Sequence, residues 1–341
     1  QSAGATPGPA AYGQGGTDAT VTDANIVLGR LDAKNFLGGA MQLDRQAAFD
    51  AVQRFADRLG LPLLDAAEGI VAVLNANMAN AIRARTVQKG IDPRDYALVA
   101  FGGAGPLHGA EVAQMLGIPE VVVPPWPGIT SAIGLLTTDL KYDRVRTAFL
   151  VSTQMDLARM NGDLADMEAS LRAQLAADGL DATGASFQRA ADARYVGQGY
   201  ELRLELPAGR LDEGALAAAL DAFHQLHERE YGHHFPQSPI ELVNLRVTAV
   251  AQVPKIRKPA PPAGGSLAAA TLRTDQAVFR VGNELSSFKT TFYDRSRLPV
   301  GTPIPGPAIL LQVDSTTVVP PGDTATVHES GSILLNLECL S

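Results

Sequence analysis

The chain has 341 residues, of which 46% are hydrophobic and 19% are charged, so it has the composition of a globular protein and the length of two or three domains. Its 28 Lys and Arg residues against 36 Asp and Glu residues give a formal net charge of -8, which argues against a nucleic-acid-binding protein. No run of 18 apolar residues occurs, so we expect no membrane span.

The first twenty residues are rich in Gly, Pro and Thr and contain no basic residue, which is unlike a signal peptide. Because the chain begins with Gln1, we expect a further segment upstream. Asp23 is expected to cap a helix that contains Ile26, since its carboxylate can accept hydrogen bonds from the first turn. Residues 45–59 are predicted to be helical because one face collects Ala47, Ala48, Ala51, Val52 and Phe55.

A crossover unit of an α/β sheet is predicted between residues 60 and 124. The strongest helix pattern runs from Leu63 to Arg85, with Asp65 as its cap. The segment from Tyr96 to Phe101 is nearly all apolar, which fits a strand buried on both faces. The unit is completed by a glycine turn at 102–106, a helix from Leu107 to Leu116 and a strand from Glu120 to Val123.

The second half of the chain is predicted to form an α+β layer, a linker and a turn-rich β segment. The layer contains helices at 156–178 and 211–231, a hairpin from Arg189 to Leu206 that turns at Gly197–Gly199, and a strand from Ile240 to Val253. The linker covers Lys255 to Ser266, and short strands follow at 278–281, 290–293, 308–313, 316–319 and 333–337. This organisation predicts three domains, over residues 1–147, 148–256 and 257–341.

The most informative motif runs from Val99 to Pro106, where a strand enters a glycine turn and then a helix. Glycine has no Cβ, so a base or a phosphate can approach the main chain closely, and the N–H groups of the next helix favour anions. The dinucleotide fingerprint G-x-G-x-x-G fails because His108 stands at its sixth position, and G-x-x-x-x-G-K-[ST] does not occur. A turn that packs on an adenosine and a purely structural turn remain as alternatives.

Other candidate groups are histidines, one serine and one cysteine. His224 and His227 are three residues apart on one predicted helix and have the spacing to share a metal, with solvated or hydrogen-bonded histidines as the alternative. His108 follows the glycine turn and can donate to a phosphate or to the backbone. Ser131 lacks the G-x-S-x-G spacing of a nucleophile. Cys339 is the single cysteine of the sequence, which rules out an intrachain disulfide and fits a reducing compartment. It lies in a predicted tail or edge strand.

Short motifs spread in order over nearly the whole chain carry a family resemblance. They are Pro9–Thr17, Thr20–Asn25, Leu28–Leu31, Asn77–Arg83, Ala100–His108, Pro127–Gly128 with Ser131–Asp139, Tyr195–Leu202, His227–Glu228 with Tyr231–Gly232, Gly306–Ile309 and Ser315–Gly322. Together they resemble the hydantoinase/oxoprolinase family, in particular the C-terminal portion of its ATP-binding A-type subunit. One departure is Ala11, where the family usually has a cysteine.

The resemblance implies an α/β fold, with one lobe of an actin/hexokinase/acetate-kinase-like ATPase core followed by an α+β layer and a β-rich C-terminal domain. It implies ATP and Mg²⁺ as cofactors. The implied nucleotide-binding residues are Gly102, Gly103, Ala104, Gly105 and Pro106, with Asn77 and Arg83 on a helix beside the nucleotide. Asp23 and His108 are assigned to the phosphate and magnesium side. The two phosphate loops would lie in an upstream half, so this chain alone is not expected to hydrolyse ATP.

The implied activity is ATP-dependent hydrolysis of a small cyclic amide, such as a hydantoin, 5-oxoproline or a lactam, with phosphorylation of the amide oxygen before ring opening. A subunit of an ATP-dependent ketone carboxylase is one alternative. A non-catalytic scaffold subunit is another, motivated by the β-rich tail after Ser266 and the acidic surface. The implied partners are the upstream half and a B-type subunit, and the implied location is the cytoplasm. No catalytic residue and no metal ligand of this chain is assigned.

Overall fold

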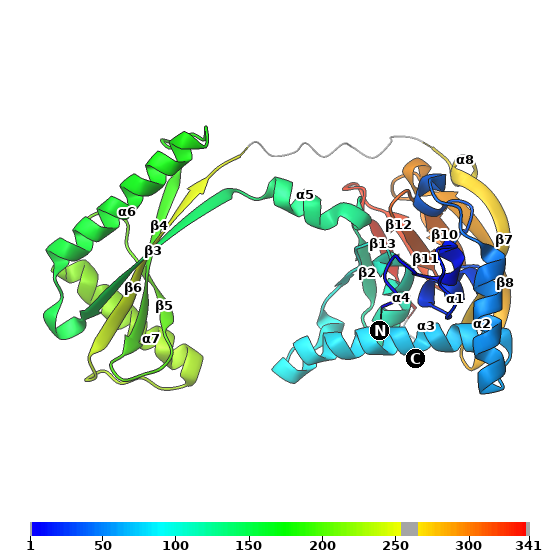
Figure 1. Ribbon diagram of the computed structural model, residues 1–341, viewed down its shortest axis with the longest axis horizontal. Helices are drawn as coiled ribbons and strands as arrows, with labels where there is room; N and C mark the ends of the chain where they lie inside the picture. The colour runs from blue at the N-terminus through cyan, green and yellow to red at the C-terminus, as the bar shows by residue number, and fades with distance from the viewer. Residues whose placement is uncertain (1, 254–264, 339–341) are drawn as a thin grey trace. The chain divides into compact units, whose positions relative to one another are not determined.

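The structure, a computed structural model, describes residues 2–253 and 265–338. They form two compact units, one of residues 2–133 with 265–338 and one of residues 134–253 (Figure 1). The predicted boundary after residue 147 falls inside a strand, and the predicted separate C-terminal domain shares the first unit because its strands extend the sheet of the crossover unit. The predicted linker up to residue 264 and Cys339 lie outside the described residues.

The first unit contains a five-stranded mixed sheet in the order β1-β2-β13-β12-β9. Its strands are β1 (Leu98–Val99), β2 (Glu120–Val123), β9 (Pro303–Pro305), β12 (Thr324–Val327) and β13 (Ile333–Asn336). β1 and β2 are parallel and joined by α4 (Gly105–Leu116), which confirms the predicted crossover unit. β13 pairs antiparallel with β2, so the C-terminal strands complete a sheet that starts more than 200 residues earlier.

β1 is a short edge strand, and the prediction that Tyr96 to Phe101 is buried on both faces is wrong. The side chains of Tyr96, Val99 and Phe101 are 60%, 53% and 51% exposed. Leu98 and Ala100 alone pack against the core of this unit. β1 ends the strand order, so no strand of the described chain covers its outer side.

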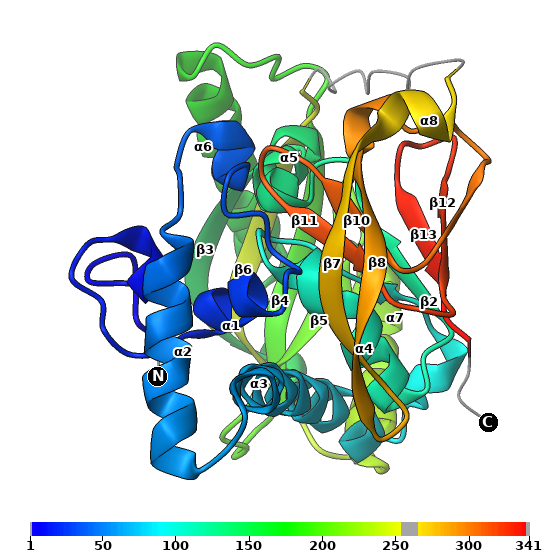
Figure 2. The same ribbon diagram turned by 90° about the vertical axis from the view of Figure 1, so that its right-hand side faces the viewer.

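A second sheet of the first unit has the order β11-β10-β8-β7. It consists of β7 (Thr271–Val281), β8 (Glu284–Asp294), β10 (Ala308–Leu311) and β11 (Thr316–Val319). Figure 2 shows β7 and β8 as a long twisted hairpin. The N–H of Val278 donates to the carbonyl of Leu28 at 2.8 Å, so this hairpin holds the chain that follows α1 (Val21–Val27).

α2 (Arg45–Leu59) and α3 (Leu63–Arg85) have the predicted bounds. The N-cap residues are Thr20 for α1 and Pro62 for α3, whereas Asp23 and Asp65 lie inside the first turns. The predicted cap at Asp65 is therefore wrong, and Asp23 takes part in capping as the partner of Thr20 in a capping box. Besides the two long helices of the second unit, the other helices within residues 2–253 and 265–338 are α5 (Thr130–Thr137), α8 (Leu267–Ala270), η1 (Ala10–Tyr12), η2 (Phe36–Gly39), η3 (Val87–Lys89), η4 (Pro93–Asp95), η5 (Pro127–Ile129), η6 (Ser152–Gln154) and η7 (Arg295–Arg297).

The second unit is an antiparallel sheet with two helices, as the α+β layer predicts. The sheet has the order β3-β6-β4-β5, with β3 (Leu140–Val151), β4 (Ser186–Tyr195), β5 (Leu202–Leu206) and β6 (Ile240–Ala251). The helices are α6 (Leu157–Ala177) and α7 (Glu213–Tyr231). The predicted hairpin and both helices are confirmed. β3 was not predicted, because charged residues alternate along it and only Ala148 and Leu150 are fully buried.

Among the described residues, no single helix is long and apolar enough to cross a membrane. One pair, α2 with the helical segment from Leu63 to Lys89, passes on length and composition alone and is bent by 92° at its break.

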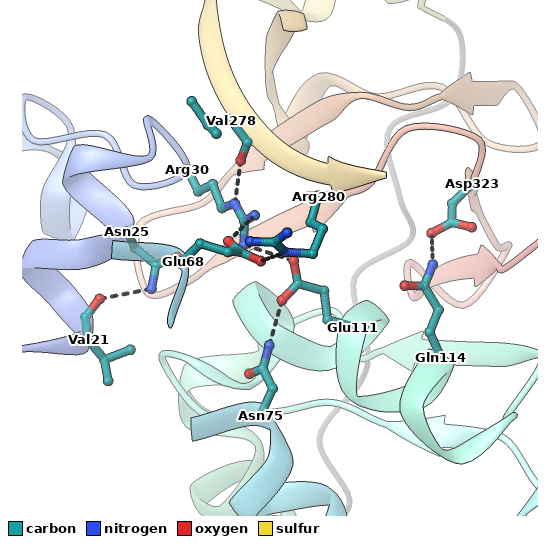
Figure 3. Close-up of polar contacts among 10 residues, drawn as sticks. All are labelled: Val21, Asn25, Arg30, Glu68, Asn75, Glu111, Gln114, Val278, Arg280 and Asp323. Carbon is teal, nitrogen blue, oxygen red and sulfur yellow. Dashed lines mark hydrogen bonds and ion pairs between the residues drawn. The ribbon is translucent and has the colours of Figure 1, made fainter. Parts of the chain in front are cut away.

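Asp323 is a buried carboxylate between α4 and the end of β13. It accepts hydrogen bonds from the Gln114 side chain and from the Glu338 N–H, both at 2.9 Å; Figure 3 shows the first contact. Burial, and next to it the charge of Glu338, raises the pKa of Asp323 to about 6, although the Glu338 N–H opposes the shift. The folded state therefore binds the proton more tightly than the unfolded chain, and the free energy of unfolding falls as the pH rises from about 4 to about 6.

We predict that Asp323→Asn raises the free energy of unfolding at neutral pH by about 1–3 kcal/mol. The change removes a buried charge, and the Gln114 amide can turn its oxygen toward the new NH2 group. Urea denaturation across the pH range checks this, because the gain should disappear below the ordinary Asp pKa of about 4, where Asp323 is protonated in both states. A gain of the same size at both ends of the range would contradict the prediction.

Candidate functional site

A cavity of about 270 Å³ lies beside the glycine turn of the first unit. This volume suits a ring system rather than a whole nucleotide. Three stretches of chain form its wall: the N-terminal segment around α1, the start of α4 and the turn between β10 and β11. The lining residues are Tyr12, Val21, Thr22, Asn25, Leu31, Asp32, Asn35, Phe36, Leu37, Gly103, Ala104, Leu107, His108, Leu311, Gln312, Val313, Asp314, Ser315 and Thr316.

The glycine turn is held by hydrogen bonds to neighbouring segments, and two of its residues face the cavity. Gly102 has φ +86°, a conformation that favours glycine, and its N–H donates to the carbonyl of Pro127 at 2.7 Å. The hydroxyl of Ser315 donates to the carbonyl of Gly103 at 3.2 Å. A Cβ on Gly102 would meet no atom within 4 Å. Gly103 and Ala104 line the cavity, so bare main chain forms part of its wall.

Of the predicted turn residues, Gly102, Gly105 and Pro106 do not line the cavity, and Gly105 and Pro106 start α4. Pro106 lies in the first turn, where its missing N–H costs no helix hydrogen bond. One turn later, a Cβ on Gly109 would lie 2.9 Å from the Cβ of Ala100. The glycine thus lets α4 pack closely on the strand segment before the turn. This packing sets the position of the α4 residues that line the cavity.

The part of the wall formed by the turn between β10 and β11, next to the glycine turn, is held by Arg295 and Gln312. The Arg295 guanidinium donates to two carbonyls at the end of β2, at 3.1 and 2.7 Å, and to the Gln312 side chain at 3.0 Å. Burial lowers the pKa of Arg295 to about 10, so it remains charged at neutral pH. At the tip of this turn, Asp314 accepts a hydrogen bond from the Gly128 N–H at 2.9 Å. These contacts give the wall a defined position.

Asp23, which the resemblance assigned to the magnesium side, is wholly buried and does not line the cavity. Its carboxylate accepts from the N–H groups of Ala10 and Ala11 at 3.2 and 2.9 Å. It also accepts from the N–H and hydroxyl of Thr20 at 3.0 and 2.7 Å, which completes a capping box. Donors of this chain thus occupy both oxygens, and Asp23 positions the loop that carries Tyr12 into the cavity wall.

His108 lies on α4, lines the cavity and is 4% exposed. Burial and, next to it, the positive charge of Arg30 lower the pKa of the imidazole to about 4, so it is uncharged at neutral pH. No residue in the described ranges forms a hydrogen bond with the ring. A neutral imidazole donates at one nitrogen and accepts at the other. His108 therefore suits an uncharged ligand group better than the phosphate for which it was predicted.

A buried ion cluster lies behind α4 (Figure 3). Arg30 pairs with Glu68 of α3 at 2.9 Å and with Glu111 of α4 at 2.8 Å, and it donates to the carbonyl of Val278 in β7 at 2.9 Å. The Asn75 amide donates to Glu111 at 2.5 Å. Burial raises the pKa of Glu68, although the charge of Arg30 opposes the shift. The cluster ties four segments together and fixes the helix that carries His108.

The structure does not bring Asn77 and Arg83 to the cavity. The Asn77 side chain is exposed on α3. Arg83 donates to the carbonyl of Met115 at 2.8 Å, near the C-terminal end of α4. The glycine turn lies at the opposite end of that helix, roughly 15 Å away at 1.5 Å per residue. α3 runs beside α4, but Arg83 contacts the end of α4 that lies away from the glycine turn.

The cavity lining within the described residues contains no lysine or arginine. Its two carboxylates have partners, since Asp32 pairs with Arg273 at 2.7 Å and Asp314 accepts from the Gly128 N–H. A phosphate would meet no cation here, and anionic groups would face it instead. The cavity therefore suits the uncharged part of a ligand, such as a nucleoside or an amide.

Asn25 and the turn between β10 and β11 are cavity residues that the sequence did not single out. Asn25 follows the N-terminal loop, and the turn lies almost 290 residues later. Asn25 is the last residue of the family-like run Thr20–Asn25, and the turn ends where the run Ser315–Gly322 begins. These two runs are the sequence signal that could have indicated both parts of the cavity.

The histidines of α7 form hydrogen bonds within the second unit. Nδ1 of the buried His227 lies 2.7 Å from the His233 carbonyl, and its Nε2 lies 3.0 Å from the Gln198 amide. Nδ1 of His224 lies 2.6 Å from the Tyr195 hydroxyl. In the part of the chain that the structure describes, no three His, Cys, Asp or Glu side chains are grouped to hold a metal. These histidines brace the loop between β4 and β5.

Two family models match this chain. The first, described as hydantoinase/oxoprolinase, matches residues 1–144, and the second, described as the hydantoinase/oxoprolinase C-terminal domain, matches residues 152–337. The chain is also 35% identical over 337 residues to the caprolactamase subunit alpha of Pseudomonas jessenii, which covers 97% of this chain and 48% of that protein.

Two solved structures resemble the fold. The ATP-dependent caprolactamase from Pseudomonas jessenii matches with a TM-score of 0.74 and 34% identity, over 98% of this chain and 49% of its own. A nucleotide-free acetone carboxylase matches with a TM-score of 0.85 and 26% identity, over 96% of this chain and 48% of its own. The fold is thus a mixed α/β architecture similar to both, and the chain spans about half the length of these relatives.

Proposed function

Because the chain belongs to the hydantoinase/oxoprolinase family, we propose that it is the ATP-binding portion of an enzyme that uses ATP to open a small cyclic amide. The observation that carries this proposal is the cavity beside Gly103 and Ala104, with exposed main chain on one wall and no cation in its described lining. Such a cavity accepts the nucleoside end of ATP. The crossover β1–α4–β2, with the glycine turn at its first corner, is then part of one lobe of an actin-like ATPase core.

The proposed reaction overcomes the low reactivity of an amide. Transfer of the terminal phosphoryl group of ATP to the amide oxygen releases ADP and weakens amide resonance. Water then adds to the activated carbon, the ring C–N bond breaks with a proton going to nitrogen, and a second water splits the resulting acyl phosphate into carboxylate and phosphate. Mg²⁺ would neutralise charge on the transferred group. Asp23, the carboxylate assigned to it, has donors of this chain on both oxygens and so does not fit a Mg²⁺ ligand.

The remaining parts of the enzyme belong to the proposal as well. The relatives are about twice as long and include subunits of larger enzymes, so we place the phosphate loops in an upstream half and ring opening with a companion B-type subunit. We also place the enzyme in the cytoplasm.

The alternative activity is ATP-dependent carboxylation of a ketone. It is favoured by the higher TM-score of acetone carboxylase, whereas the sequence identity favours caprolactamase. ATP turnover by the full-length protein with its companion subunit separates the two, because a hydrolase responds to lactams or hydantoins and a carboxylase needs bicarbonate with a ketone. A scaffold subunit would bind no nucleotide at all.

We predict that Gly103→Asp weakens ATP binding by the full-length protein at least about tenfold, because it adds a side chain and a charge to the cavity wall. A Cβ at Gly103 would lie 3.7 Å from the carbonyl oxygen of Asp314, an ordinary contact, so the fold should be retained. Isothermal titration with ATP measures the change, and a thermal melt checks the fold.

The matched control is Gly69→Asp, at an exposed glycine of α3 where a Cβ meets no atom within 4 Å. It should bind ATP like the unsubstituted protein. Equal ATP affinity of the Gly103→Asp protein and this control would count against the assignment of the cavity.

A further inference from the structure

Two buried side chains that line the cavity have polar atoms that form no hydrogen bond with any residue that the structure describes. Asn25 is 1% exposed and His108 is 4% exposed. The Asn25 amide nitrogen donates to the carbonyl of Val21 at 2.9 Å (Figure 3), but its oxygen accepts nothing from the described residues. Buried polar groups are nearly always hydrogen-bonded, so two uncommitted ones in the lining of one cavity indicate a ligand site. The unpartnered oxygen of Asn75, by contrast, is enclosed by protein.

The orientation of the Asn25 amide is fixed by Val21. If the amide turned over, its oxygen would face the Val21 carbonyl, and two acceptors would meet. The oxygen therefore stays on the cavity side, where it can only accept a hydrogen bond. His108 is uncharged and can donate or accept. The pair offers one obligatory acceptor and one adaptable group, both neutral.

We propose that Asn25 and His108 select the nucleoside that this cavity takes, with the Asn25 oxygen accepting a hydrogen bond from an uncharged N–H or O–H donor of the ligand. His108 bonds the group next to that donor. The inference rests on the proposed function, since it takes the ligand to be ATP. Adenosine carries suitable donors in its exocyclic amine and its ribose hydroxyls. A 6-oxo purine has a carbonyl oxygen in place of the amine and would set two acceptors against each other.

The experiment measures the affinities of ATP, ITP and 2′-deoxyATP by isothermal titration of the full-length protein with its companion subunit. We expect ATP to bind at least about tenfold more tightly than one of the two analogues, because a site built for a hydrogen bond rejects a ligand that lacks it. Loss with ITP identifies the exocyclic amine as the donor, and loss with 2′-deoxyATP identifies the ribose hydroxyl.

Asn25→Leu should weaken ATP binding about tenfold and leave the disfavoured analogue unchanged, so the preference disappears. His108→Leu should reduce the preference as well. Asn336→Leu is the matched control, because Asn336 is exposed on β13 and outside the cavity, and it should retain the preference.

Equal affinity of the unsubstituted protein for all three nucleotides would overturn this inference while leaving ATP binding intact. A full preference for ATP in folded Asn25→Leu and His108→Leu proteins would also overturn this inference. Absence of ATP binding in the unsubstituted protein would overturn the proposed function and, with it, the role of the pair. Thermal melts show which variants are folded. If Asn25→Leu is not, the comparison of the three nucleotides and the His108→Leu variant decide.

Discussion

Replacement of Arg30 by methionine is expected to lower the free energy of unfolding by about 3–5 kcal/mol. Arg30 is buried and balances Glu68 and Glu111, so its removal leaves these two carboxylates with only the more distant Arg280, 3.9 Å from Glu68, as a described cation. The lost bond to the Val278 carbonyl adds to this cost. Denaturant unfolding at neutral pH measures the change, with the first unit as the part that should melt early.

Arg94→Met is the control for this prediction. Arg94 pairs with Asp92 on the surface, its side chain is 70% exposed, and removal of such a pair should leave no measurable change. Adding Glu68→Gln and Glu111→Gln to Arg30→Met should restore part of the loss, because the stranded charges are then gone. A loss in Arg30→Met no larger than that of the control would show that the cluster does not stabilise the unit.

Asp23→Asn should destabilise the protein by about 2–4 kcal/mol, although it changes one atom. Both carboxylate oxygens accept hydrogen bonds, and asparagine replaces one of them with an NH2 group that faces donors. The loop that Asp23 holds contains Tyr12, so the variant should also bind ATP more weakly if the cavity is the nucleotide site. Denaturant unfolding and titration with ATP measure the two effects.

The matched control is Asp156→Asn at the cap of α6. Asp156 is exposed and accepts from the Arg159 N–H at 2.9 Å, and asparagine caps helices about as well as aspartate. Its stability should therefore change little. An Asp23→Asn protein as stable as this control would contradict the role given to the Asp23 carboxylate.

Local patterns predicted the helices well and the burial of strands poorly. α2 and α3 have the predicted bounds because their apolar periodicity is a property of neighbouring residues. The apolar segment around β1 was expected inside a sheet, but whether a strand is central or at an edge depends on pairing partners far away in the chain. The pairing of β13 with β2 likewise joins parts of the chain that are far apart in sequence, so composition does not reveal that the C-terminal strands belong to this sheet.

The candidate site likewise has one part that the local sequence identifies and another part that only the fold brings together. Gly103 and Ala104 were identified because the glycine turn is contiguous and its chemistry is local. Asn25 and the turn between β10 and β11 meet them only through the fold. Asp23 was assigned to the wrong role because its type permits a metal ligand, a cap and a buried clamp, and only the positions of its donors distinguish them. The resemblance placed the helix with Asn77 and Arg83 beside the nucleotide, but it gave no information on which turn of α3 lies nearest the cavity.

One turn of α4 serves two purposes. His108 faces the cavity and Glu111, three residues later, belongs to the ion cluster, and both sense the charge of Arg30. Substitutions in this short stretch of α4 therefore affect both the nucleotide preference and the stability of the fold. An engineer who wishes to broaden the range of accepted nucleotides has more freedom at Asn25, because it lies outside the cluster that keeps this half of the molecule together.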